Sequence, residues 1–172
     1  MVADSAILTS TLAPPKSFAA LMSLYESNYL RLSWIIDSLD RLGPAGSEYQ
    51  SEVPGDCCLF LTVCDVSPYT STLHLTYRFE EAGERVCDPD LSVRVYRDAR
   101  LAEAMACGGR RCHPALTNFD TNTGAELRRR WTRNIMLNKW LEYCADRGHG
   151  FSMGTSVGEA PTGGSRPSTG VR

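Results

Sequence analysis

Apolar residues occupy every second position in two neighbouring stretches near the middle of the chain. Leu59, Leu61 and Val63 form the first set, and residues 73–79 repeat the pattern with Thr, His and Arg at the intervening positions. Successive side chains of a β-strand point to opposite faces, so this period predicts antiparallel strands with one packed face and one wetter face. The rest of the chain then has to cover one side of a sheet.

Further segments extend the predicted sheet. Residues 91–95 alternate in the same way, and residues 101–107 give a weaker, alanine-rich strand. A helix over residues 99–106 is the alternative, because Ala and Glu favour helix. Residues 48–53 are predicted as a short edge strand and residues 80–89 as an acidic loop.

Two segments with helical periodicity flank the sheet. Between residues 18 and 39, apolar residues recur at steps of three and four, which is typical of an amphipathic helix. Ser17 is the predicted N-cap, and Gly43–Pro44 is expected to end this helix. The second helix is predicted from about residue 125 to residue 147, where Gly148 follows.

These elements predict an α+β fold. A long N-terminal helix, an antiparallel meander of four to five strands and a C-terminal helix form one domain over residues 17–148, with both helices on one face of the sheet. Residues 1–16 are expected to be a flexible leader and the Gly- and Ser-rich residues 149–172 a disordered tail. Function should be sought on the uncovered face of the sheet.

The composition points to a cytoplasmic protein. The sequence has no run of about 18 apolar residues, so no membrane partner is expected, and it lacks the basic and apolar regions of a secretory signal. Seven cysteines, an odd number, fit the reduced thiols of a cytosolic protein. Cys64 and Cys144 lie in apolar-rich segments and are predicted as small core residues.

Charge is unevenly distributed along the chain. Residues 1–93 carry 5 Lys/Arg and 13 Asp/Glu, whereas residues 94–133 carry 9 Arg and 4 acids. Such asymmetry marks either a partner surface or two complementary faces of one domain. The arginine-rich segment 128–133, which includes Trp131, suggests contacts with nucleic acid, but the net charge of −2 disfavours that partner.

Four segments together resemble a known family. They are LMSLYESNY at 21–29, the turn from Asp65 to Thr70, VRVYRDARLAE at 93–103 and NKWLEYC at 138–144, of which V-R-x-Y-x-D-A is the most specific. In this order, over about residues 20 to 148, they resemble the YqiB-like family of proteobacterial proteins of unknown function. The resemblance implies a small cytoplasmic bacterial protein whose gene often lies beside genes for an ADP-ribose pyrophosphatase and a cyclic-nucleotide phosphodiesterase. It implies no activity.

Polar positions of the predicted strands and turns supply candidate binding residues. Hydroxyl groups beside a carboxylate in the turn 65–72 can bind a phosphate or a sugar, although Asp, Ser and Thr also satisfy turn backbone groups. Arginine offers a planar fork that matches phosphate or carboxylate, although a solvated face with cross-strand pairs gives the same pattern. The candidates for ligand or partner binding are Asp65, Tyr69, Thr70, His74, Arg78, Arg94, Tyr96 and Asp98.

The sequence predicts neither a catalytic set nor a cofactor. Cys107, Cys112 and His113, together with Cys57 and Cys58, suggest zinc, but no second ligand pair has a clear spacing. Glycine-rich phosphate-binding loops are missing from the sequence. No metal is therefore expected.

The leading hypothesis is a non-enzymatic binding or adaptor module that recognises a protein or a nucleotide-like anion through the exposed sheet face. The first alternative is a small enzyme acting on a nucleotide-like substrate, which requires Asp65, Tyr69, His74, Arg94 and Asp98 to converge in a concave pocket. The second alternative is nucleic-acid binding through the arginine-rich start of the C-terminal helix. The oligomeric state is left open.

Overall fold

The computed structural model describes residues 17–108 and 123–153. The elements follow in the order α1 (Phe18–Ile35), η1 (a 3-10 helix, Leu39–Arg41), β1 (Glu48–Ser51), β2 (Cys58–Val66), β3 (Thr70–Glu81), β4 (Glu84–Tyr96), β5 (Leu101–Gly108) and α2 (Thr123–Arg147). The predicted leader and most of the predicted tail lie outside the described residues.

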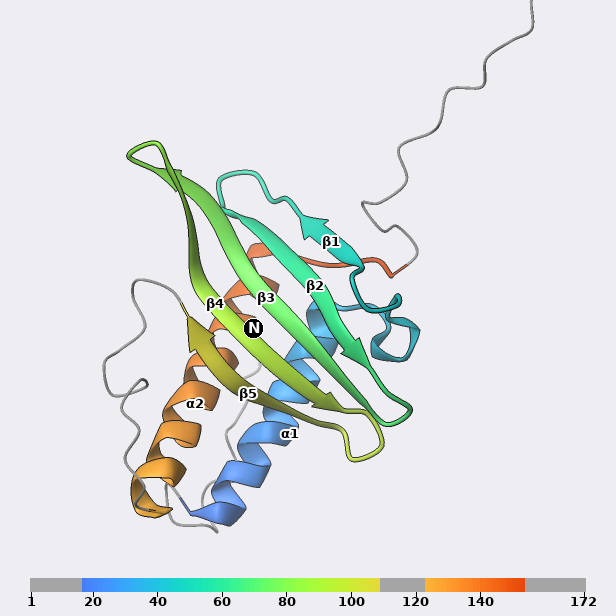
Figure 1. Cartoon of the computed structure of the whole chain (residues 1–172), viewed down its shortest axis with the longest axis vertical. Helices are drawn as coiled ribbons and strands as arrows, with labels where there is room; N and C mark the ends of the chain where they lie inside the picture. The colour runs from blue at the N-terminus through green and yellow to red at the C-terminus, as the bar shows by residue number, and fades with distance from the viewer. Residues whose placement is uncertain (1–16, 109–122, 154–172) are drawn as a thin grey trace, which may run out of the picture.

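The five strands form one antiparallel sheet in the order β1-β2-β3-β4-β5. This confirms the predicted α+β meander, and residues 101–108 are a strand rather than a helix. Both helices lie on one face of the sheet, and the β3–β4 hairpin extends beyond the other strands (Figure 1). The opposite face carries no helix within the described residues.

The core lies between the sheet and the two helices. Leu61, Leu75 and Leu91 are register partners on neighbouring strands, and all three are fully buried. Leu32 of α1 and Leu141 of α2 pack in the same cluster. Burial of one such side chain contributes about 1.5–3 kcal/mol. The alternating apolar residues therefore determine which face of each strand packs against the helices.

Helix α1 begins where the sequence predicts but ends earlier. The Ser17 Oγ accepts a hydrogen bond from the Ala20 N at 3.2 Å, which confirms the N-cap. The helix stops at Ile35 instead of Gly43, because Ile36 has extended backbone angles and forms a parallel β-bridge with Phe151. Ile36 is buried from an extended segment and Leu39 from the short 3-10 helix η1, so their three-residue spacing does not continue the α-helix.

Residues 80–89 are not an acidic loop. Strand β3 continues to Glu81 and β4 starts at Glu84, so only Ala82 and Gly83 form the hairpin turn, with φ values of 53° and 80°. Two positive φ angles at a two-residue turn suit the twist of a hairpin, and the polar composition of this segment hides the strands. Phe79 and Val86 are register partners in this extension.

Two further boundaries differ from the prediction. Cys64 is exposed at a bulge in β2, so it is not a core residue, whereas Cys144 is buried as predicted. The disordered tail predicted from residue 149 begins later, because His149 and Phe151 are buried against α1 and β1. Within the described residues, neither helix is both long enough and apolar enough to span a membrane.

Candidate functional site

The face of the sheet that points away from the helices carries most of the candidate residues. We call it the open face. Two register rows cross it: Thr62, His74 and Ser92 form one row, and Asp65, Thr72 and Arg94 form the other. The bulge at Cys64 places Asp65 opposite Thr72, which brings this carboxylate into the second row.

One end of the open face is formed by the β2–β3 and β4–β5 turns, which are joined by hydrogen bonds. The Arg97 N donates to the Tyr69 O at 2.9 Å, and the Arg97 guanidinium bonds the carbonyls of Ser67 and Pro68. This contact joins the β2–β3 turn to the β4–β5 turn, because Arg97 follows directly after β4. Sequence reasoning did not single out Arg97, whose role depends on contacts about 30 residues away.

Four candidates lie at or near these turns. Tyr69 is 68% exposed at the β2–β3 turn, and Asp98 is exposed at the β4–β5 turn. Thr70 and Tyr96 are register partners at the strand ends. They share one end of the sheet, but no described contact links the Tyr69 hydroxyl to the Asp98 carboxylate.

The Arg94 side chain is exposed and forms no hydrogen bond or ion pair with any other described residue. Its register partner on β5 is Glu103, but neither carboxylate oxygen pairs with Arg94: Oε2 accepts a hydrogen bond from the Tyr96 hydroxyl at 3.4 Å, and Oε1 is turned towards the helices. The Glu103 Oε1 accepts a hydrogen bond from the Tyr25 hydroxyl at 2.8 Å and lies 3.4 Å from the Arg130 Nη1. Arg94 is therefore left available on the open face.

His74 forms a cross-strand pair with Asp90. The His74 Nε2 lies 2.6 Å from the Asp90 Oδ1, and both side chains are about one-third exposed. A histidine held by a carboxylate can act as a base only if a reacting group lies within hydrogen-bond reach. Among the described residues no hydroxyl or thiol forms a hydrogen bond with the side chains of this pair, so it is a polar cross-strand pair of the open face.

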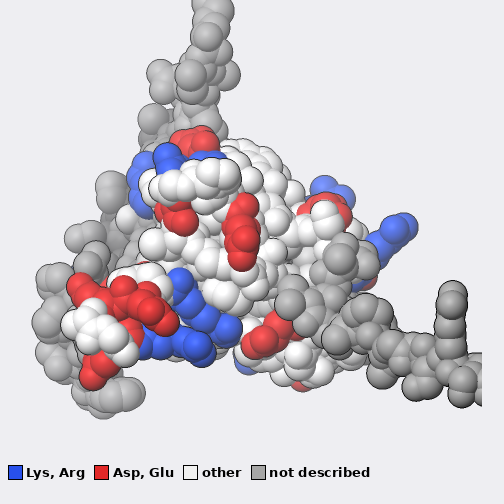
Figure 2. Space-filling view, turned by 90° about the horizontal axis from the view of Figure 1, so that it is seen from above, with Lys and Arg blue, Asp and Glu red and all other residues white. Residues whose placement is uncertain are grey.

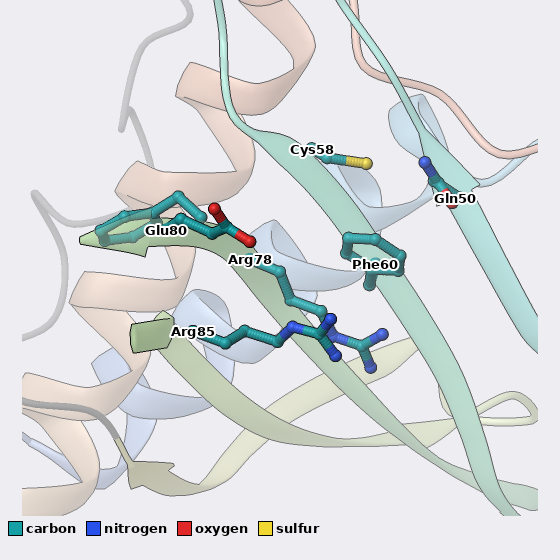
Figure 3. A pocket seen from close by; sticks show the side chains of 7 residues that line it. Gln50, Cys58, Phe60, Arg78, Glu80 and Arg85 are labelled. Carbon is teal, nitrogen blue, oxygen red and sulfur yellow. The ribbon is translucent and has the colours of Figure 1, made fainter. Parts of the chain in front are cut away.

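Arg78 lies at the other end of the open face, in a hollow of about 360 Å³. Its guanidinium carbon lies 4.1 Å from the centre of the Phe60 ring, and its Nη2 lies 3.7 Å from the Glu48 Oε1. Figure 3 shows Arg78 and Arg85 extending from neighbouring strands towards the same region beside Phe60. The hollow is lined by Gln50, Cys58, Phe60, Arg78, Phe79, Glu80 and Arg85, and we call it the arginine hollow.

Arg85 and Phe60 were missed as site residues. Arg85 fell in the segment predicted as a loop, so its alternation with the buried Val86 was not used. Glu80 and Arg85 are register partners, and the Ala82–Gly83 turn between them is the sequence signal that could have placed both on a hairpin.

A second hollow, of about 420 Å³, lies on another part of the molecule. It is bounded by the end of α1, by β1 and by the segment after α2, with Trp34, Ser51 and Gly150 in its wall. It contains none of the eight candidate residues, and the arginine hollow contains only Arg78. The five residues required by the enzyme hypothesis therefore line neither hollow.

The arginine-rich start of α2 is largely paired with carboxylates. Arg129 and Arg130 each lie 3.0 Å from Glu126, and Arg133 lies 3.8 Å from the same residue. Pairing with Arg130 and Arg129 lowers the pKa of Glu126, although burial acts in the opposite direction. Figure 2, seen from above, shows the end of the molecule opposite to this start of α2, where basic and acidic side chains lie close together.

Metal ligands do not gather in the part of the chain that the structure describes. Among residues 17–108 and 123–153, no three His, Cys, Asp or Glu side chains form a group that could hold a metal ion. Cys107 lies in β5, one residue before its end, whereas Cys112 and His113 lie outside the described residues.

Comparison with known protein families gives a match over most of the fold. A family model described as "Protein of unknown function (DUF1249)" matches residues 36–150, which span the sheet, α2 and the first residues after it. No curated protein and no solved structure matches the chain.

Proposed function

The chain belongs to this family of proteins of unknown function, and we propose that it is a non-enzymatic binding or adaptor module that recognises a protein or a nucleotide-like anion through the open face. The YqiB-like segments and the many thiols support the further proposal that it is a cytoplasmic bacterial protein. The unpaired guanidinium of Arg94 is the observation that carries the proposal.

Arginine is the side chain best suited to such a role. Its planar fork donates two parallel hydrogen bonds to a carboxylate or a phosphate, and it is more weakly hydrated than lysine. On the open face this fork is not used internally, because Glu103 is bound by Tyr25 and Arg130 instead. Thr72, the register partner of Arg94 on β3, adds a hydroxyl beside it.

Neither alternative function has an observation of this kind. The enzyme alternative needs a concave pocket that gathers its five residues, and the two hollows do not contain them. Nucleic-acid binding through α2 requires several arginines that are free to meet phosphates, whereas Arg129, Arg130 and Arg133 are paired with Glu126. Of this cluster, Arg128 alone has no side-chain partner among the described residues.

The experiment is affinity capture from native bacterial lysate, analysed for proteins and for small molecules. Three baits are compared: the parent chain, Arg94→Ala, and Lys139→Ala on the exposed surface of α2, where Lys139 is 65% exposed. We expect Arg94→Ala to lose the ligand or partner that the parent and Lys139→Ala retain. Its free energy of unfolding should change by less than about 0.5 kcal/mol, as for an exposed side chain without partners.

Two results contradict this proposal. Equal recovery on the parent and on Arg94→Ala removes Arg94 from the binding surface. Unfolding of Arg94→Ala in a thermal melt places this residue in the structural network of the sheet instead.

A further inference from the structure

The arginine hollow at the hairpin end of the open face has the chemistry of an anion site. Resting on the function proposed for that face, we propose that this hollow is a subsite for a phosphate monoester dianion, held between Arg78 and Arg85. Three features support it: a fixed guanidinium, an unpaired guanidinium and a lining that is otherwise neutral or apolar except for Glu80.

Arg78 is already held in place. Its guanidinium lies 4.1 Å from the centre of the Phe60 ring, and a cation over an aromatic face is stabilised by the ring quadrupole. The Glu48 carboxylate, 56% exposed, forms a loose ion pair with Arg78 at 3.7 Å, which is longer than a hydrogen bond. Phe60 and Glu48 thus orient the guanidinium, whose nitrogens form no hydrogen bond with another described residue.

Arg85 brings a second positive charge to the same place. Its side chain is exposed and forms no hydrogen bond or ion pair with another described residue, although Glu80 is its register partner. Figure 3 shows the Arg85 and Arg78 side chains converging below the Phe60 ring, with the Glu80 carboxylate nearer to the stem of Arg78 than to the guanidinium groups in this view. Two cations in one hollow repel each other unless an anion lies between them.

The charge of the ligand follows from this pair. A phosphate monoester carries about −1.5 to −2 charges at pH 7 and offers three acceptor oxygens, so it can neutralise both guanidinium groups. A carboxylate has one charge and two acceptor oxygens, so it would engage the two guanidinium groups less completely than a phosphate. A phosphate is therefore favoured over a carboxylate.

The remaining wall suits the organic part of a small ester. Phe60 and Phe79 supply apolar surface, and Gln50 supplies an amide. Burial raises the pKa of the Cys58 thiol, so this side chain stays neutral and does not repel an anion. A hollow of about 360 Å³ lies near the lower limit for small-molecule sites, which fits a compact ester with one ring.

The test is a titration with phenyl phosphate followed by ¹H–¹⁵N NMR of the full chain. Parent, Arg85→Gln and Arg128→Gln are compared, since Arg128 is an exposed arginine on α2 and its substitution makes the same change of charge. In the parent, we expect the backbone signals of β2, β3 and β4 around the hollow to shift. Arg85→Gln should weaken binding about ten-fold or more, and Arg128→Gln should leave it unchanged.

Benzoate serves as the second probe, because it keeps the ring and replaces the dianion by a monoanion. It should bind the parent at least about ten-fold more weakly than phenyl phosphate. Raising the pH from 5 to 8 should strengthen phenyl phosphate binding, since the second phosphate ionisation lies near pH 6.

Several results would overturn the subsite. These are no shift in the parent at about 10 mM phenyl phosphate, equal affinity in parent and Arg85→Gln, equal losses in both variants, or benzoate binding as tightly as phenyl phosphate. If phenyl phosphate fails these tests while Arg94→Ala still loses the captured ligand or partner, the phosphate subsite is wrong and the open-face proposal stands. If phenyl phosphate binds as expected while capture does not depend on Arg94, the role of Arg94 is wrong and the phosphate subsite stands.

Discussion

Among single residues, Asp56 connects parts of the chain that are far apart in sequence. It precedes β2, and its Oδ1 accepts a hydrogen bond from the Cys57 N at 2.7 Å. Its Oδ2 lies 3.1 Å from the Arg147 Nε and 3.5 Å from the Nε2 of the buried His149. Burial by itself raises the pKa of Asp56, but the hydrogen bonds from Cys57 and Arg147 outweigh it, so this pKa lies below its ordinary value.

The sign of this shift predicts a pH-dependent stability. The ionised form of Asp56 is favoured in the folded state, so its contribution is present above about pH 4 and is lost as the pH falls through the lower folded-state pKa. We expect Asp56→Asn to reduce the free energy of unfolding by about 1–2 kcal/mol at pH 7 and by much less at pH 3. Urea denaturation at both pH values measures this difference.

Asp98→Asn is the control, because Asp98 is an exposed carboxylate in the β4–β5 turn with no partner among the described residues. Its substitution should change stability by less than about 0.5 kcal/mol at either pH. A loss in Asp56→Asn that stays constant between pH 7 and pH 3 contradicts the proposed role of the charge.

The candidate site could be predicted only in part at this scale. Period-2 alternation places His74, Arg78 and Arg94 on the open face, because the pleat fixes which side chains share a side. It cannot predict that Glu103 turns away from Arg94 towards Tyr25, since that depends on how α1 packs against β5. The same holds for contacts between the start of β2 and the end of α2.

At the scale of elements, the edge of the sheet at β5 is closed by asparagine side chains. The Asn134 Oδ1 accepts a hydrogen bond from the Ala104 N at 2.8 Å, and the Asn28 Nδ2 donates to the Ala102 O at 3.3 Å. Asn28 also donates to the Asn134 Oδ1 at 3.0 Å. Two helices thus satisfy backbone groups that a further strand would otherwise pair, which protects this edge from pairing with another chain.

Replacing Asn134 should open this edge. In Asn134→Leu, which keeps a similar volume, the buried Ala104 N–H loses its acceptor, and an unsatisfied buried donor costs about 1–3 kcal/mol. We expect a loss of stability of that size in urea denaturation. The Ala104 amide should also exchange its hydrogen faster than the amides at the centre of β3.

Asn138→Leu provides the matched comparison. Asn138 donates to Ser27 and Asn28 but does not contact the backbone of β5. It should therefore lower stability without a selective increase in exchange at Ala104. Equal exchange at Ala104 in both variants would show that Asn134 does not close the edge.

Elements were predicted well wherever apolar residues repeat with one clear period. The strands over residues 58–66 and 70–79 and the helix over residues 123–147 follow such repeats. Prediction failed at the hairpin tip, where the residues beyond Phe79 and before Val86 are mostly polar and the apolar repeat is lost. It also failed after Ile35, where buried residues continue the spacing of a helix without its backbone.

At the scale of the whole molecule, the segment after α2 closes the fold. Phe151 forms a parallel bridge with Ile36, and its N donates to the Ile35 O. The Ser51 Oγ accepts a hydrogen bond from the Gly150 N at 3.0 Å and lies 3.1 Å from the His149 Nδ1. The end of the domain is thus attached both to the end of α1 and to β1, and the family match ends at residue 150, inside this attachment.

This arrangement predicts that Phe151 is needed for the stability of the whole domain, although the composition of residues 149–172 predicts a disordered tail. Phe151 is 3% exposed, so Phe151→Ala should lower the free energy of unfolding by about 3–5 kcal/mol. The same change at Phe18, which is 69% exposed at the start of α1, should cost less than about 0.5 kcal/mol. Urea denaturation of the full chain, followed by circular dichroism and by tryptophan fluorescence, measures both. If the segment is part of a single cooperative unit, the two signals should change together in Phe151→Ala. A loss in Phe151→Ala no larger than that in Phe18→Ala would show that the segment only lies on the surface of a domain that is complete at residue 148.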